Sequence, residues 1–433
     1  MRYILSVTHR WAGLAIAAFL FVSGVTGAVV SWDHELDDLL NPHLMNAVTT
    51  GPARPSLELA REIEARDPEI VVTDIPLVLE EGKSFAFWVE PRVDPATGRI
   101  FEPGYNQVFI DPPTGNELGR REWGAVWPLS SENFVSFLYV LHYSLHIPRM
   151  WGIDMWGMWF MGVIALIWTI DCFVGFYLTL PARRERRERR AAIVEQQLAR
   201  GFWARWAPAW RIKTSGSAYR VNFDIHRAFG LWLWLLLFIL AVSAVSLNLN
   251  HEVAQPLVKL FSSFTPTPFD TRIPQAEENP ILPQQSFETI LERARAEGDR
   301  RGWTQPIGSV FYSQSYGVYG VTFYHPGDDH GAAGVGNPAL YYDGIDGQPA
   351  GDFVPWRGTA GDLFLQVQFP LHSGRIAGLP GRILISFMGL VVAALSVTGV
   401  VIWYRKRIAR LRRTSRAAVG TGSRRPEIPA AAE

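Results

Sequence analysis

Histidine side chains recur at matching places in the two halves of this 433-residue chain. His9-Arg10 stands directly before one long apolar stretch, and His226-Arg227 stands before another, 217 residues later. A glycine follows each histidine by four residues, Gly13 in one half and Gly230 in the other. Two imidazoles facing each other between helices are suited to the iron of a b-type haem, and a histidine near a bilayer is costly without a partner. The glycine, on the same helix face, leaves a bare patch that a flat ring can approach.

A second set of histidines precedes two further apolar stretches. Leu141-His142 and Leu371-His372 occupy similar positions, and we expect His142 and His372 to form the second haem-ligating pair. His146 lies on the same helical face as His142, and pairing it with His372 aligns Arg149 with Arg375. His146 therefore stays open as the alternative ligand or as a hydrogen-bond partner. The i,i+4 spacing of 142 and 146 also suits zinc or iron, but no carboxylate stands at helical spacing beside them.

The two proposed pairs, His9 with His226 and His142 with His372, also have a simpler interpretation. These histidines could be interfacial anchors or polar residues hydrogen-bonded within helices. His34 and His251 repeat the 217-residue spacing, and each precedes a glutamate. We expect both to cap helices at the membrane interface, with a propionate or substrate contact as the alternative. Asp171 is the one acid within the apolar stretches, so it bonds a neighbouring helix or takes part in proton movement. Three other histidines are expected in loops: His43, His325 and His330.

The elements that must position these residues are membrane-spanning. Four stretches are long and apolar enough to cross a bilayer, at residues 11–32, 155–180, 228–250 and 383–404. The first is longer than a signal-peptide core and lacks a small-residue cleavage site, so we expect a retained signal anchor. The single cysteine, Cys172, lies in the second stretch, which excludes an intrachain disulfide and a Cys-x-x-Cys-His haem attachment.

The net charge of zero hides an uneven distribution that predicts the orientation. Residues 181–227 hold 12 Lys and Arg against 4 Asp and Glu, whereas residues 33–154 hold 9 against 20. Because basic connections stay in the cytoplasm, we expect both termini inside and the acidic loops outside, in a bacterial inner membrane. We divide the chain into membrane helices at 1–33, 151–181, 228–250 and 381–405, external loops at 34–150 and 251–380, and basic cytoplasmic segments at 182–227 and 406–433. No nucleic-acid partner is expected.

The two external loops share one order of elements. Each opens with a helical pattern, at 57–63 and 287–297, and continues with three strand-like runs: 70–73, 85–90 and 107–110 in the first, and 309–312, 318–324 and 339–342 in the second. We predict two small α+β domains, each with one helix on an antiparallel sheet. Gly331, Gly334 and Gly336 lie between strand-like runs rather than in a strand-to-helix turn, so we read them as a flexible loop and not as a phosphate-binding loop.

Together these features resemble the PepSY-associated transmembrane family. The resemblance rests on His9-Arg10-Trp11-x-Gly13 before a span, the loop ending Asp111-Pro112-Pro113-Thr114-Gly115, and Leu371-His372-Ser373-Gly374-Arg375 before the last span. It covers nearly the whole chain. It implies a four-helix membrane protein, built by internal duplication, with two PepSY-like periplasmic domains.

Some members resemble di-haem inner-membrane reductases that release iron from ferric siderophores. The resemblance thus implies two haems b, held by His9 with His226 and by His142 with His372, and a ferric siderophore or another ferric chelate as substrate. A cytoplasmic or membrane electron donor is expected as partner, since this chain lacks the flavoprotein domain linked to other members. Two other functions stay open: a haem electron conduit to a protein partner, and a non-enzymatic scaffold or peptidase modulator.

Overall fold

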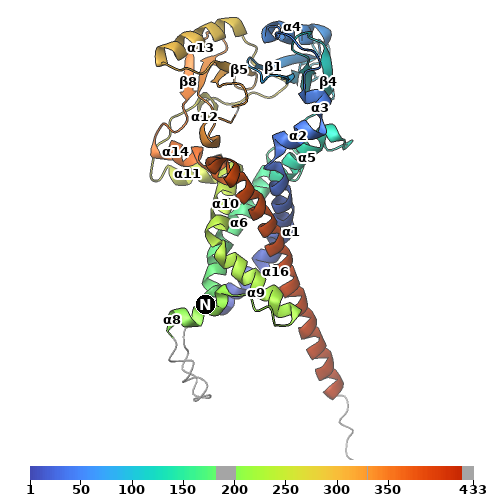
Figure 1. The fold of residues 1–433 in the computed structure, drawn as a ribbon, viewed down its shortest axis with the longest axis vertical. Coiled ribbons are helices and arrows are strands. Elements are labelled where there is room, and N and C mark those ends of the chain that lie inside the picture. Colours follow the sequence, from blue (N-terminus) through green and yellow to red (C-terminus); the bar gives the residue numbers. More distant parts are fainter. Residues whose placement is uncertain (182–200, 329, 422–433) are drawn as a thin grey trace, which may run out of the picture. The chain divides into compact units, whose positions relative to one another are not determined.

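The computed structural model describes residues 1–181, 201–328 and 330–421 (Figure 1). The chain divides into two compact units. One comprises Met1–Val25, Val163–Val242 and Met388–Glu433, and the other comprises Thr26–Gly162 and Ser243–Phe387. Parts of the predicted basic segments 182–227 and 406–433 lie outside the described residues.

Among the described residues, three helices are long and apolar enough to cross a membrane: α1 (Arg2–Val30), α6 (Trp156–Thr179) and α16 (Gly378–Thr421). At about 1.5 Å per residue, the 24 residues of α6 reach about 36 Å, more than the ~30 Å of a bilayer core. These helices cover three of the four predicted spans, at 11–32, 155–180 and 383–404. The chain is therefore a membrane protein with several spanning helices.

The predicted third span, 228–250, is broken. Helix α9 (Ala218–Trp232) and helix α10 (Trp234–Asn248) meet at an angle of 70°, and together they count as a fourth span only if the bent pair is taken as one. The sequence of α9 explains the break. Asp224, which is fully buried, accepts hydrogen bonds from Arg220 and Arg227 at 2.8 and 2.7 Å. Charged groups are costly in hydrocarbon, so a helix that carries this cluster does not simply extend the apolar run of α10. Helix α8 (Phe202–Trp206) and the 3₁₀ turn η1 (Ala207–Trp210) precede α9.

Each of the two loop segments contributes one packing helix and four strands. The first segment forms α4 (Ser56–Arg66), β1 (Ile70–Pro76), β2 (Phe85–Pro91), β3 (Gln107–Ile110) and β4 (Glu117–Arg121). The second forms α13 (Phe287–Arg301), β5 (Ile307–Ser313), β6 (Val318–Phe323), β7 (Ala339–Asp343) and β8 (Pro349–Phe353). The predicted helices and the six predicted strands are confirmed. The last strand of each half was not predicted, because both are short and mostly polar or glycine-containing.

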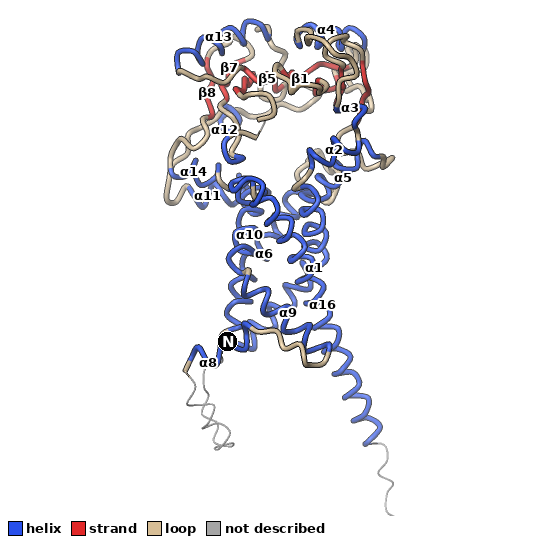
Figure 2. Tube along the Cα trace, viewed as in Figure 1, coloured by secondary structure: helices blue, strands red, loops and turns tan. Residues whose placement is uncertain are grey.

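The eight strands belong to one antiparallel sheet, in the order β4-β3-β2-β1-β5-β6-β7-β8. The two halves join where β1 pairs with β5, with Asp74 opposite Phe311 and Pro76 opposite Ser309. Figure 2 shows the strands in one layer with α4 and α13 on the same face, and one apolar core runs beneath both helices. Two separate sheets are expected from the sequence, one for each loop. Pairing β1 with β5 satisfies backbone groups that two isolated edge strands would expose, so the halves share a sheet.

Shorter helices connect the sheet to the long helices. On the first-loop side these are α2 (Asp33–Leu40), α3 (Pro42–Met45) and α5 (Ser131–Ser144). On the second-loop side they are the π-turn η2 (Asn250–Ala254), α11 (Gln255–Val258), α12 (Pro268–Thr271), α14 (Ala360–Gln366), α15 (Gln368–Ser373) and η4 (Arg375–Ala377). A further short turn, η3 (Ala332–Gly334), lies between two strands. The glycines around η3 lie in the connection from β6 to β7, which is not the strand-to-helix turn of a phosphate-binding loop.

Candidate functional site

His9 of α1 and His226 of α9 lie close together within one compact unit. Their ring centroids lie 6.3 Å apart, and their planes are inclined by 56°. A metal bonded to one nitrogen of each ring, with bonds of about 2 Å on opposite sides, would place the centroids about 6.4 Å apart. The observed separation therefore suits two imidazoles that share one iron from opposite sides.

Hydrogen bonds fix the tautomers of this first pair. Nδ1 of His9 lies 2.9 Å from both carboxylate oxygens of Asp171, and Nδ1 of His226 lies 3.1 Å from the carbonyl oxygen of Leu395. A carboxylate and a carbonyl only accept, so Nδ1 donates in both rings, and in a neutral ring Nε2 then keeps its lone pair. Neither Nε2 makes a hydrogen bond to another of the described residues. Asp171 thus has the first of its two predicted roles, a bond to a neighbouring helix.

Four glycines surround the first pair in two different ways. A Cβ placed on Gly175 would lie 3.5 Å from Cε1 of His9, and one placed on Gly399 would lie 3.2 Å from Cε1 of His226. These two glycines therefore pack against the imidazole rings. A Cβ placed on Gly13 or Gly230 would meet no atom within 4 Å. The glycines one turn after each histidine therefore border open space, as a flat ligand beside the helix requires.

The arginines that follow these histidines are also suited to an anionic ligand. Among the described residues, three buried side-chain polar atoms have no hydrogen-bond partner, and two of them are Nε of Arg10 and Nε of Arg227. Buried polar groups are normally satisfied, so each orphan needs an explanation. Both belong to the repeated His-Arg element, and a guanidinium there matches an anionic group such as a haem propionate. The residues of this site therefore fit a haem.

His142 of α5 and His372 of α15 form a similar pair in the other compact unit. Their ring centroids lie 6.0 Å apart, again inclined by 56°. Nδ1 of His142 lies 3.1 Å from the hydroxyl of Thr26, and Nδ1 of His372 lies 2.9 Å from the hydroxyl of Ser243. Neither hydroxyl residue is among the candidates predicted from the sequence. A signal was present, because Thr26 and Ser243 are separated by the same 217 residues as His9 and His226.

His146 is not brought to His372. Helix α5 ends at Ser144, and the next two residues take left-handed backbone conformations, with φ of 56° at Leu145 and 51° at His146. The chain therefore turns back, and Nε2 of His146 donates to the carbonyl of Phe137 at 2.8 Å while the two rings stack. The i,i+4 spacing that would have aligned His146 with His142 does not apply beyond the helix end. Among the described residues, no group of three or more His, Cys, Asp or Glu side chains could hold a metal ion.

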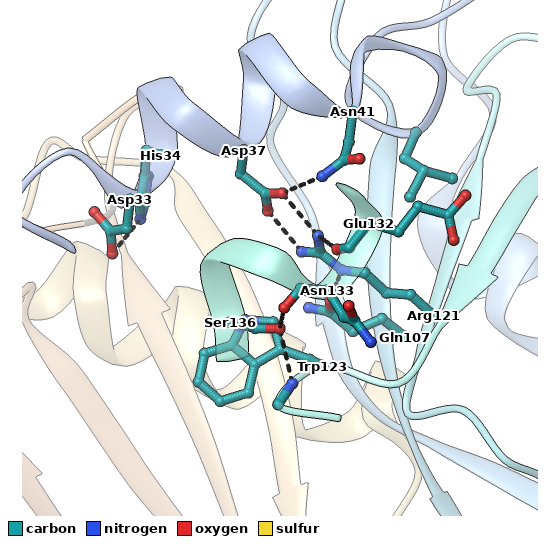
Figure 3. A network of polar contacts seen from close by, with 12 residues as sticks. Asp33, His34, Asp37, Asn41, Gln107, Arg121, Trp123, Glu132, Asn133 and Ser136 are labelled. Carbon is teal, nitrogen blue, oxygen red and sulfur yellow. Dashed lines mark hydrogen bonds and ion pairs between the residues drawn. The ribbon is translucent and has the colours of Figure 1, made fainter. Parts of the chain in front are cut away.

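A buried polar network holds the beginning of α5, the helix that carries His142 (Figure 3). Arg121 of β4 is 5 % exposed and pairs with Asp37 of α2 at 2.8–2.9 Å. The same guanidinium donates to Gln107 of β3 and to the main-chain carbonyl of Glu132 in α5. Because one side chain bonds α2, the sheet and α5, the position of His142 depends on the sheet and on α2.

The remaining histidines and their neighbours lie in short helices, at helix ends or in loops. Glu35 pairs with Arg382 at 2.7 Å, and this guanidinium holds the pKa of the Glu35 carboxyl at about 2. The ring of His34 lies 4.8 Å from that of His330. Glu252 accepts a hydrogen bond from the indole of Trp159 at 2.7 Å, and His251 is exposed on η2. His43, expected in a loop, lies instead in α3 and contacts Glu132 at 3.0 Å, whereas His325 is an exposed loop residue as expected.

Comparison with known families adds to this geometry. The sequence pattern of a family described as the PepSY-associated TM region matches residues 7–406. The chain belongs to the PepSY-associated transmembrane family. No curated protein matches the sequence. The matched range contains both histidine pairs of this PepSY-associated protein and the partners of their Nδ1 atoms.

Proposed function

We propose that this PepSY-associated membrane protein binds two haems b and transfers electrons to ferric siderophores. The observation that carries the proposal is the repeated pair geometry: two couples of imidazoles with centroids 6.3 and 6.0 Å apart, each ring with its Nδ1 hydrogen-bonded. Hydrogen-bonding the non-ligating nitrogen is the usual arrangement around metal-bound histidine, since it fixes the ring and its tautomer.

His9 and His226 would hold one haem, and His142 and His372 would hold the other. A haem supplies a one-electron carrier whose potential depends on its ligands and its surroundings. The protein's own contribution is placement. Asp171, Leu395 and the two hydroxyl residues orient the four rings, and Gly13 and Gly230 leave room beside the first pair. Arg10 and Arg227 offer buried N–H groups to an anion.

Substrate chemistry needs no acid or base from the chain. One electron converts iron(III) in a siderophore to iron(II), which hard oxygen donors hold far less strongly, so the metal is released. The proposed location is a bacterial inner membrane, with the basic segments in the cytoplasm and the eight-stranded sheet in the periplasm. Fusion of a reporter active only in the periplasm tests this orientation, with signal expected at position 120 or 340 and none at 420.

An absorption spectrum of the detergent-purified protein is the first test. Two six-coordinate, low-spin haems per chain are expected. A colourless but stable and monodisperse protein, made with ample haem, would instead favour the scaffold function.

A second test addresses the substrate. Anaerobically reduced protein is mixed with a ferric hydroxamate siderophore and an iron(II) trap, without any other protein. Rapid reoxidation with trapped iron(II) supports siderophore reduction. Protein that stays reduced with several ferric chelates, but is oxidised by a protein acceptor, would favour the conduit function.

A further inference from the structure

The four paired histidines differ in the partner of their second nitrogen. Both carboxylate oxygens of Asp171 lie 2.9 Å from Nδ1 of His9, and the Asp171 side chain is 11 % exposed. His226 has a neutral carbonyl and the hydroxyl of Thr398 at 3.0 Å. The second pair has the hydroxyls of Thr26 and Ser243. Of these described contacts to the four Nδ1 atoms, the contact of His9 is the one made with a carboxylate.

Asp171 is not explained by the repeated architecture. Asp171 lies four residues before Gly175, which contacts the His9 ring. Leu395 likewise lies four residues before Gly399, which contacts the His226 ring. At the position of Leu395 the main-chain carbonyl bonds the histidine, which any residue provides. The hydrogen bond from His9 to Asp171 thus has a neutral counterpart in the bond from His226 to the Leu395 carbonyl. A neutral acceptor is enough to orient the ring, so the negative charge of Asp171 is not needed for orientation.

We propose that Asp171 is a positioning residue that makes the two haem sites unequal, an inference that rests on the proposed function. A carboxylate bonded to Nδ1 makes the imidazole a stronger donor through Nε2 and favours the more positive, oxidised iron. The His9–His226 site is then harder to reduce than the His142–His372 site. Electrons shared between the two sites collect at His142 and His372, the pair carried by the part of the chain that includes the sheet.

The experiment uses the full chain with His372→Ala, which leaves one haem to observe. In this background, Asp171→Asn keeps the size of the side chain and a neutral acceptor but removes the charge. The expected result is retained haem with a midpoint potential higher than that of the parent, measured by spectroelectrochemical titration. Asp171→Glu keeps a carboxylate and is expected to stay closer to the parent. Thr398→Val is the matched control, since His226 keeps its bond to the Leu395 carbonyl, and its midpoint should change least.

Two results would overturn the inference. One is an Asp171→Asn protein that keeps its haem and its midpoint potential, which would leave Asp171 as an ordinary bond between α1 and α6. The other is loss of haem from a normally assembled Asn variant, which would show that the residue acts through structure alone. Neither result is confused with failure of the proposed function, because in that case the parent protein and all its variants would contain no haem.

Discussion

The two histidine pairs have nearly the same geometry but different support. Their centroid separations differ by only 0.3 Å (6.3 against 6.0 Å), and both are inclined by 56°. The first pair sits on α1 and α9 and is oriented by a carboxylate and a carbonyl. The second sits on α5 and α15, short helices outside the long spans, and is oriented by hydroxyls. The distance between the two rings is therefore nearly the same in both pairs, whereas the hydrogen-bond partners of Nδ1 differ. These partners can therefore give the two sites different chemical properties.

Removing a ligand should have the largest effect and should divide the variants into two classes. We expect His9→Ala or His226→Ala to lose one haem equivalent and His142→Ala or His372→Ala to lose the other, because each pair belongs to a different unit. The measurement is haem stoichiometry with the spectrum of the remaining haem. His146→Ala is the control and should keep both haems, since its ring bonds Phe137. If variants of both pairs perturbed the same haem, the pairing would be wrong.

Breaking the buried Arg121–Asp37 pair should affect the second pair far more than the first. Arg121→Met leaves the Asp37 carboxylate, 16 % exposed, without its cation, and we expect destabilisation of about 3 kcal/mol. The measurement is thermal unfolding together with haem content at each site. The double variant Arg121→Met/Asp37→Leu should recover much of the loss, because no charge is left unpaired. Equal damage to both haem sites would show that the second pair does not depend on this network.

The glycines that contact the rings should respond differently to a methyl group. A Cβ on Gly27 would lie 2.8 Å from Cε1 of His142, whereas a Cβ on Gly175 would lie 3.5 Å from Cε1 of His9. We therefore expect Gly27→Ala to displace His142 and cost about 1–3 kcal/mol, and Gly175→Ala to be nearly silent. Low-temperature electron paramagnetic resonance, which is sensitive to ligand orientation, gives the comparison. A larger effect of Gly175→Ala than of Gly27→Ala would mean that the His9 ring is packed more tightly against its glycine than the His142 ring is.

Removing the hydroxyl partners should have a smaller effect. Thr26→Val and Ser243→Ala delete the neutral hydrogen bonds to the rings of His142 and His372, each worth about 1 kcal/mol. Both variants should keep two haems and change the midpoint potential of the second site less than Asp171→Asn changes that of the first. Potentiometric titration of the two-haem protein measures this. A larger shift from either hydroxyl variant would reverse the proposed order of influence.

The smallest expected effect concerns the ion pair between Glu35 and Arg382. Because Arg382 lowers the pKa of Glu35 to about 2, the pair adds stability above pH ~4.5 that is lost as the pH falls toward 2. The Glu35 side chain is 52 % exposed, so Glu35→Gln should cost less than about 1 kcal/mol at pH 7 and nothing near pH 2. Thermal unfolding of the parent and of Glu35→Gln across this pH range tests whether the stability difference between them shrinks as the pH falls. Arg382→Gln should give a similar loss, and the double variant should lose little more.

Local patterns in the sequence were enough to find most elements. Apolar length predicted α1, α6 and α16, and alternation with turn residues predicted α4, α13 and six strands, because these signals depend on neighbours a few residues away. The repeated His-Arg-x-x-Gly spacing singled out His9 and His226, and the Leu-His element singled out His142 and His372. The family resemblance came from the same motifs.

Contacts between distant segments decided the rest. The left-handed turn that ends α5 decides that His142, and not His146, lies beside His372. On an uninterrupted helix the two histidines would lie on the same face, so the sequence does not distinguish them. The partners Asp171, Thr26 and Ser243 lie more than 100 residues from their histidines, so no local pattern assigns them. The joining of β1 to β5 and the bend before Trp234 likewise reflect pairing and burial that form only on folding. The sequence therefore determined which residues carry the chemistry, and the tertiary structure decided which of them meet and what holds each ring.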